Sequence, residues 1–124
     1  MFQRNKDERR TTKMRTLTET GVNKIGKRLV DSVAHAAYTL DGQPKTIEIF
    51  RRSAEAGSAK VYVYFDDTIS GKVANVQLVD TDGDVIATTP PEREFVKPTS
   101  KGLYIAFKYN IKEMETEVEI NASV

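Results

Sequence analysis

A strict alternation runs through residues 60–66 (KVYVYFD), where two valines and Phe65 alternate with Tyr62 and Tyr64. Successive side chains of a strand point to opposite faces of a sheet, so this period of two predicts a strand with one buried face. Similar short runs predict roughly six to eight strands in all. The other predicted strands are residues 33–40, 46–52, 72–80, 85–88, 94–97, 103–111 and 113–120.

Tight-turn signals separate these runs. Residues 41–42 (DG) and 81–84 (TDGD) place a glycine directly after an aspartate, and that pair accepts the positive φ angles of short hairpin turns. Residues 53–59 (SAEAGSA) are expected to form a loop of small residues. Residues 33–40 (VAHAAYTL) are also compatible with a helix, but the adjacent turn signal favours a hairpin strand.

Short connections constrain the topology. Parallel strands need crossovers of about a dozen residues or more, so these strands are expected to pair antiparallel. The sequence therefore predicts a mainly β fold, an immunoglobulin-like antiparallel β-sandwich with one short N-terminal helix and a basic arm. In this chain of 124 residues we expect one β-rich domain at 19–124 and a flexible or extended arm at 1–18.

The helix is predicted over residues 19–32 (ETGVNKIGKRLVDS). Val22, Ile25 and Leu29 fall on one helical face, and Thr20 is the expected N-cap. Two glycines within this segment count against a helix, because mid-helix glycine costs about 1 kcal/mol relative to alanine. In the strand at 72–80, the residues expected to face the core are Ala74, Val76 and Leu78.

A basic head precedes an acidic body. Residues 1–30 carry nine Lys and Arg against three acids, and residues 31–124 carry ten against fifteen. The head fits a solvated tail lying on the body, or a contact with nucleic acid or a membrane surface. It contains no aromatic residue after Phe2, so it lacks the stacking groups of single-strand binders. Residues 1–13 also fit an upstream extension before a natural start at Met14.

Composition excludes several classes of site. Without cysteine there are no disulfides, thiol nucleophiles or Cys-ligated zinc. No apolar run approaches the roughly 18 residues of a membrane span, and the charged N-terminus does not resemble a signal peptide. We therefore expect the protein in the cytoplasm or in a particle assembled there.

Some acidic segments resemble catalytic or metal sites but fit turns better. Residues 80–84 (DTDGD) lack the spacing of glycine and glutamate in a calcium-binding EF-hand loop. Asp66 and Asp67 are adjacent on a strand and therefore point apart. His35 has no serine and aspartate pattern around it, and the glycines form no phosphate-binding motif. We expect a protein that is not an enzyme, with no catalytic residues, metal or cofactor.

Candidate partner-binding surfaces remain. Four glutamates share one face of residues 113–120, which fits a solvated face that discourages aggregation or a docking face for a basic partner, such as another copy's N-terminal segment. Three tyrosines are expected either on one exposed face, where aromatic residues favour interfaces, or under the helix. The candidate residues are Arg9, Arg10, Lys13, Lys24, Lys27, Arg28, Tyr62, Tyr64, Tyr104, Glu113, Glu115, Glu117 and Glu119.

Three segments resemble a known group of proteins: residues 62–73 (YVYFDDTISGKV), 78–87 (LVDTDGDVIA) and 97–111 (KPTSKGLYIAFKYNI). They are similar to small uncharacterised proteins of phages and prophages of Gram-positive bacteria, encoded among tail and tail-fibre components. The resemblance covers residues 17–112, leaving out the basic head and the glutamate strand. It offers no catalytic residues to carry over, and it implies a virion or tail-associated role.

We therefore expect a non-catalytic structural or interaction protein of a phage or prophage particle, located in the virion or the bacterial host cytoplasm. It would bind other virion or tail proteins, as a homo- or hetero-oligomer, through its β surfaces and N-terminal arm. One alternative is a nucleic-acid-associated protein that uses residues 4–28. Another is a small carbohydrate-binding β-sandwich that uses the tyrosine face. No membrane or small-molecule partner is expected.

Overall fold

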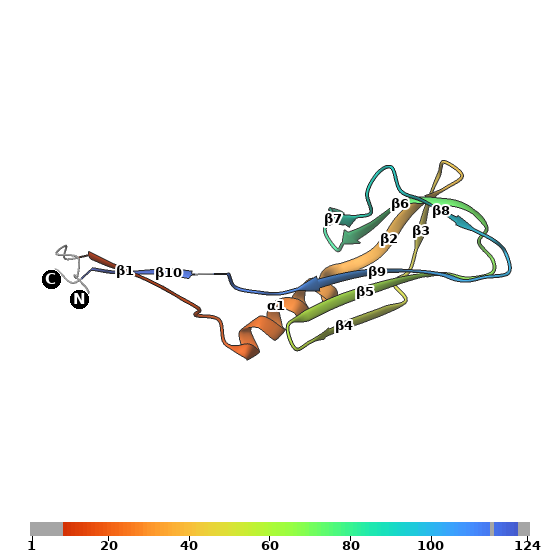
Figure 1. Ribbon diagram of the computed structural model, residues 1–124. Helices are drawn as coiled ribbons and strands as arrows, with labels where there is room; N and C mark the ends of the chain where they lie inside the picture. The colour runs from red at the N-terminus through yellow and green to blue at the C-terminus, as the bar shows by residue number, and fades with distance from the viewer. Residues whose placement is uncertain (1–8, 115, 122–124) are drawn as a thin grey trace.

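The computed structural model describes residues 9–114 and 116–121. Two antiparallel sheets and one helix form the body, and a two-stranded ribbon projects from it (Figure 1). The elements in chain order are β1 (Arg9–Met14), α1 (Glu19–Ser32), β2 (Val33–Leu40), β3 (Gln43–Ile47), β4 (Arg51–Glu55), β5 (Ser58–Phe65), β6 (Gly71–Asp80), β7 (Val85–Thr88), β8 (Glu94–Lys97), β9 (Leu103–Asn110) and β10 (Thr116–Asn121).

The body is built from two sheets. One has the order β3-β2-β6-β7, with β8 also paired to β6, and the other has the order β4-β5-β9. Every pairing is antiparallel. The predicted mainly β, antiparallel, sandwich-like fold with one helix is therefore confirmed. The immunoglobulin-like connectivity stays a prediction.

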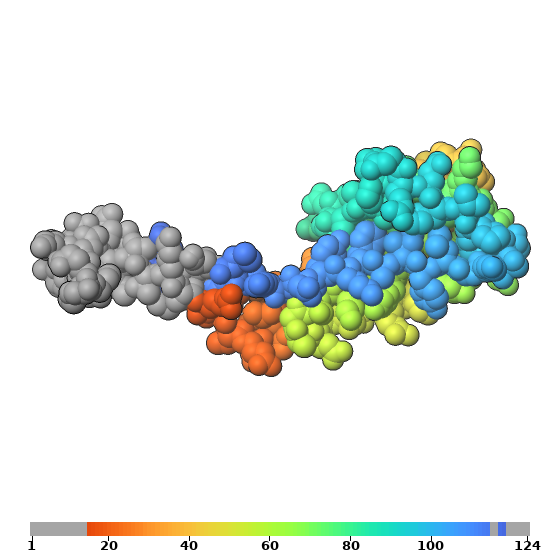
Figure 2. All heavy atoms as spheres, in the orientation of Figure 1, coloured from red at the N-terminus to blue at the C-terminus, as the bar shows by residue number. Residues whose placement is uncertain are grey.

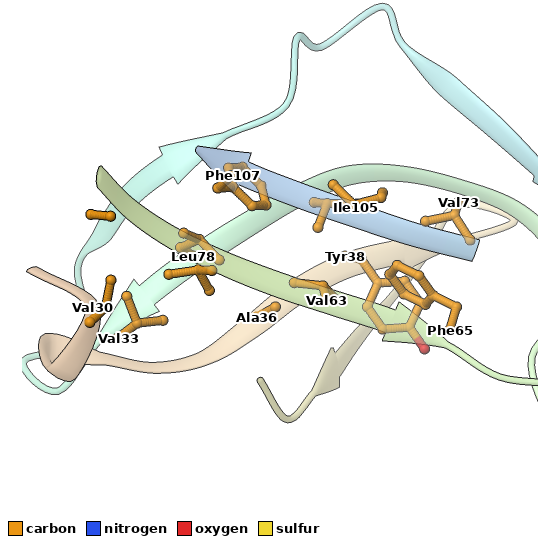
Figure 3. Close-up of a cluster of buried hydrophobic side chains, with 13 residues drawn as sticks. Val30, Val33, Ala36, Tyr38, Val63, Phe65, Val73, Leu78, Ile105 and Phe107 are labelled. Carbon is orange, nitrogen blue, oxygen red and sulfur yellow. The ribbon is translucent and has the colours of Figure 1, made fainter. Parts of the chain in front are cut away.

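The core lies between the two sheets, where β5 and β9 face β2 and β6 (Figure 3). On β5 the expected alternation is confirmed, because Val61, Val63 and Phe65 are buried while Tyr62 and Tyr64 are only partly buried. Tyr38 from the opposite sheet meets Phe65 edge-on, with ring centroids 4.8 Å apart. The remaining core residues are Val30, Val33, Ala36, Ala59, Val73, Val76, Leu78, Ile105 and Phe107.

Helix α1 has the predicted bounds, but its details differ. Thr18, not Thr20, is the N-cap, and its hydroxyl accepts a hydrogen bond from the Gly21 N–H. The buried face carries Gly26 and Val30, whereas Ile25 is 40% exposed. Glycine is buried there because the helix packs closely on small side chains of the β4–β5 sheet.

A bulge shifts the pattern of β6. Asn75 has a positive φ of 51°, and the pairing with β2 changes register at this point. Val73 consequently joins the core cluster, Ala74 is buried outside that cluster, and Val76 and Leu78 face the core as predicted. Thr89 provides hydrogen-bond partners for the backbone next to the bulge. Its hydroxyl accepts from the Val76 N–H, and its own N–H donates to Val76 O.

The first hairpin turns at residues 41–42 as predicted. Residues 33–40 form strand β2 rather than a helix, and β3 is antiparallel to it. The predicted strand at 46–52 is wrong, however, because β3 ends at Ile47 and β4 begins at Arg51. The predicted loop at 53–59 is also wrong. The positive φ angles of Ala56 and Gly57 make a two-residue turn between β4 and β5.

Candidate functional site: a projecting ribbon and an aromatic face

Strands β1 and β10 form the ribbon. They pair antiparallel with each other, and within the described residues neither pairs with a strand of the body. Figure 1 shows the ribbon extending away from both sheets, and Figure 2 shows how the chain narrows where it leaves the body. The basic segment of residues 9–14 is thus extended and joined to the glutamate-rich end of the same chain.

The base of the ribbon is tied together by Glu113. Its carboxylate accepts hydrogen bonds from the Thr16 N–H (2.8 Å), the Leu17 N–H (2.9 Å) and the Thr16 hydroxyl (3.0 Å). These bonds, with that of Leu17 the largest cause, hold the pKa of Glu113 below its ordinary value. They join residues 96 and 97 positions apart in the chain.

A second tie connects the ribbon to the body. The Ile111 N–H donates to Gly57 O at 2.6 Å, in the turn between β4 and β5. The Gly57 N–H in turn donates to the side-chain oxygen of Asn23 on α1 at 3.0 Å. One glycine therefore links the helix, the β4–β5 turn and the chain leading to the ribbon.

The four glutamates predicted to share one strand face do not all lie on the strand. The predicted strand at 113–120 begins only at Thr116, because Glu113 lies in the connecting segment and binds residues 16–17. Glu117 is exposed and stands opposite Lys13 in register, and Glu119 stands opposite Thr11. Glu115 lies outside the described residues. The side chains of Glu119, Arg9, Arg10 and Lys13 also lie outside the described part.

The candidate cations of the helix lie on its surface. Lys24, Lys27 and Arg28 are all exposed on α1. Lys27 pairs with Asp31 one turn later at 2.7 Å. An exposed pair of this kind contributes about 0.3–0.5 kcal/mol, so it is a minor feature of the helix surface.

The tyrosines lie together on the outer face of the β4-β5-β9 sheet, which was one of the two alternatives for them. Tyr64 and Tyr104 stand opposite each other in register and stack with centroids 4.4 Å apart. Phe50 adds a third ring, at 5.3 Å from Tyr64 and 5.7 Å from Tyr104. Arg51 lies over the ring of Tyr62 at 5.8 Å. We call Phe50, Tyr62, Tyr64 and Tyr104 the aromatic platform.

Gly102 fixes the position of Tyr64. A Cβ at residue 102 would lie 2.5 Å from Cε1 and 2.6 Å from the hydroxyl of Tyr64. A side chain at residue 102 would have to displace the end of the Tyr64 ring, which lies directly against the glycine.

The local sequence gives no sign of the roles of Phe50 and Gly102. Phe50 lies between β3 and β4, outside any regular alternation, and its N–H donates to Tyr62 O at 2.9 Å. Its contact with residues 64 and 104 depends on the sheet register, which the local sequence does not reveal. The glycine's role depends equally on a ring supplied by a distant strand.

The acidic segments serve as turns, as the hairpin interpretation predicted. Asp66 accepts from the Thr68 N–H and hydroxyl, and the side-chain bond is the larger cause that lowers the pKa of Asp66. Asp80 accepts from the N–H groups of Asp82 and Asp84, which brings these three carboxylates within 4.8 Å of one another. His35 is a partly buried residue of β2.

Neither protein-family models, curated proteins nor solved structures contain a match to this chain. Within the described part, no helix has both the length and the apolar character needed to cross a membrane.

Proposed function

We propose that this chain is a non-catalytic structural protein of a phage or prophage particle, associated with the tail, which joins neighbouring subunits through the β1–β10 ribbon. The observation that carries the proposal is the ribbon itself. A two-stranded ribbon is only marginally stable in water by itself, because it has no second layer against which to bury apolar surface. A subunit that covers it would supply that layer.

The base of the ribbon supports this role. Glu113 and Ile111 fix the two outgoing segments to each other and to the body, so the ribbon starts from a defined direction. A projecting element with a fixed origin suits head-to-tail contacts, which produce rings or filaments from identical subunits. The resemblance of residues 17–112 to proteins encoded among phage tail components points to the same class of assembly.

Assembly is tested with the full chain by size-exclusion chromatography and light scattering over rising concentration. The test variant is Thr11→Pro/Thr12→Pro, which removes two successive backbone donors of β1 and so disrupts the ladder whichever one faces β10. We expect oligomers for the parent chain and monomers for the variant. A parent chain that is monomeric at every concentration, with ribbon amides as protected as those of the body, would contradict assembly through the ribbon.

The virion role has its own test. Particles purified from a host that carries the gene are analysed by mass spectrometry, and the chain is expected among the tail proteins. Its absence from particles in which the tail proteins are detected would reject the virion role. That result would leave assembly through the ribbon to be judged by light scattering.

A further inference from the structure

The outer face of the β4-β5-β9 sheet carries the cations of Arg51, Lys60 and Lys108, and Glu55 stands opposite Ser58 one row beyond the lysines. Lys60 and Lys108 stand directly opposite each other on β5 and β9. Like charges at opposite positions destabilise a sheet. The ion pair found among the described residues, Lys27 with Asp31, is on the helix, so no described acid neutralises this pair within ion-pair distance.

The cations adjoin the aromatic platform. Arg51 stands opposite Tyr62, which is two residues along β5 from Lys60. Two residues of a strand span about 6.7 Å, so the row of Tyr64 and Tyr104 lies about 13 Å from the lysine row. The same face therefore presents rings, a ring with an arginine, and a lysine pair in successive rows.

A shallow hollow lies between these groups. Its volume is about 340 Å³, and its walls include Phe50, Tyr62 and Tyr104 together with the cations of Arg51 and Lys108. Ala106 provides the floor, because it stands opposite Tyr62 and its methyl group leaves the space above it open. This volume is near the lower limit of ligand sites, about 300 Å³, so the hollow fits one ring-sized unit of a longer ligand.

We propose that this face binds single-stranded nucleic acid. Bases would stack on the ring of Tyr104, which is 60% exposed, and on the partly buried ring of Tyr62, while Arg51, Lys60 and Lys108 would neutralise phosphates. Proteins that bind single strands combine aromatic rings with cations. Every base has a face that can stack on a ring, and every nucleotide carries a phosphate charge. A polyanion also removes the repulsion between the two lysines.

Two other partners fit less well. Sugar hydroxyls require acceptors as well as donors, and the charged groups lining the hollow are cations, which only donate. Lysine is depleted at protein interfaces, so the opposed lysine pair favours a polyanion over an ordinary protein surface.

Binding is tested by fluorescence anisotropy with the full chain and a labelled oligothymidylate of about 12 nucleotides. Tyr104→Ala and Tyr62→Ala are expected to weaken binding by about 5- to 150-fold each, the equivalent of about 1–3 kcal/mol of stacking per base. Tyr104→Phe keeps the ring and should bind like the parent chain. Since Tyr104 is well exposed, its truncation leaves the core intact, which the circular dichroism spectrum verifies.

The lysines are tested through salt dependence between about 50 and 200 mM. The slope of log affinity against log salt is negative. Lys60→Gln and Lys108→Gln should each make it shallower by about 0.7, the value for one single-strand phosphate contact. Lys45→Gln removes the same charge from an exposed position on β3, in the other sheet, and should change neither affinity nor slope.

Several results would overturn the proposal. These are the absence of binding at low salt, equal binding by the tyrosine-to-alanine variants, or equal competition by polyglutamate or heparin, which carry charge without bases. Loss of binding on Arg9→Gln/Arg10→Gln/Lys13→Gln, with the Lys60 and Lys108 variants unchanged, would also reject it. That last pattern would assign nucleic-acid binding to the N-terminal segment instead.

Discussion

The body and the ribbon are both antiparallel β structure, yet they owe their stability to different sources. The body encloses a core between two sheets, in which Val63, Phe65 and Val73 are fully buried. The ribbon has ladder hydrogen bonds but no facing layer among the described residues. Because burial of apolar surface is the dominant favourable term in folding, pairing by itself gives the ribbon little independent stability.

The contrast between the body and the ribbon indicates which surfaces a partner could stabilise. A surface that is already stable gains little from a partner, whereas a ribbon that meets no other described strand gains a layer. The aromatic platform is intermediate between the body and the ribbon, since its rings lie on a stable sheet but are accessible to ligands. Amide hydrogen exchange should separate the regions, because local opening costs far less free energy where few apolar contacts are buried.

The largest effect is expected from emptying the core. Phe65→Ala removes a fully buried ring that meets Tyr38 edge-on, and should lower the free energy of unfolding by about 3–5 kcal/mol in denaturant titrations. The size-matched pair is Val63→Ala on β5, whose side chain is fully buried, and Val118→Ala on β10, which should change the free energy of unfolding by no more than about 0.5 kcal/mol. Similar costs for the two valine variants would mean that the ribbon is packed like the body.

Arg52 provides the next test, because it fixes the helix to the body. Its guanidinium donates to Val30 O at 3.0 Å and Val33 O at 2.5 Å, at the end of α1. Arg52→Ala leaves these carbonyls without that donor and should cost about 1–3 kcal/mol in thermal or denaturant unfolding. The neighbouring Arg51→Ala loses only an exposed ring contact, expected to be about 0.5–1 kcal/mol. Equal losses of stability for the two variants would mean that the hydrogen bonds of Arg52 do not stabilise the end of α1.

Local patterns predicted most of the body. The alternation in residues 60–66 and 103–110 depends only on which neighbours face the core, and the positive-φ turn at 41–42 is specified by its own two residues. Helix bounds followed from spacing for the same reason. Where every second side chain must be apolar because it faces the core, the local sequence is enough to predict the strand.

Long-range contacts explain the errors. The pairing of β1 with β10 joins residues more than 100 positions apart, and the RRTTKM segment shows no apolar alternation. The bulge at Asn75 depends on Thr89, and the buried position of Gly26 depends on the sheet that it packs against. At the candidate site, the tyrosine face was predictable from alternation, but Phe50 and Gly102 were not, since their partners come from other strands.

A smaller effect, of opposite sign, is expected at Gly26. A Cβ there would meet Ile111, Ala59 and Ala54 at 3.6–3.8 Å, which is ordinary contact. Gly26→Ala should therefore raise the free energy of unfolding by up to about 1 kcal/mol, because alanine is the better helix former. Denaturant titration measures this gain. A loss of stability would show that the helix cannot accept a methyl group where it crosses the sheet.

The smallest effect on the whole molecule is expected from Glu113→Gln, which acts on the ribbon alone. The amide keeps one acceptor oxygen but loses the charge-assisted bonds to the N–H groups of Thr16 and Leu17. Those two amides should exchange faster with solvent, while the denaturant midpoint of the whole chain stays at the parent value. Glu92→Gln, at an exposed turn residue, should change neither quantity.

Acid should have the same consequence as that substitution. Because the folded pKa of Glu113 is lowered, its contribution is complete above the ordinary glutamate pKa and is lost as the pH falls through the lowered value. An NMR titration should show the Glu113 carboxyl protonating at lower pH than exposed glutamates, together with the loosening of Thr16 and Leu17. If that carboxyl titrates normally while the ribbon base stays closed, Glu113 is not what closes the base, and the bond from the Ile111 N–H to Gly57 O, which does not respond to pH, is the contact that remains.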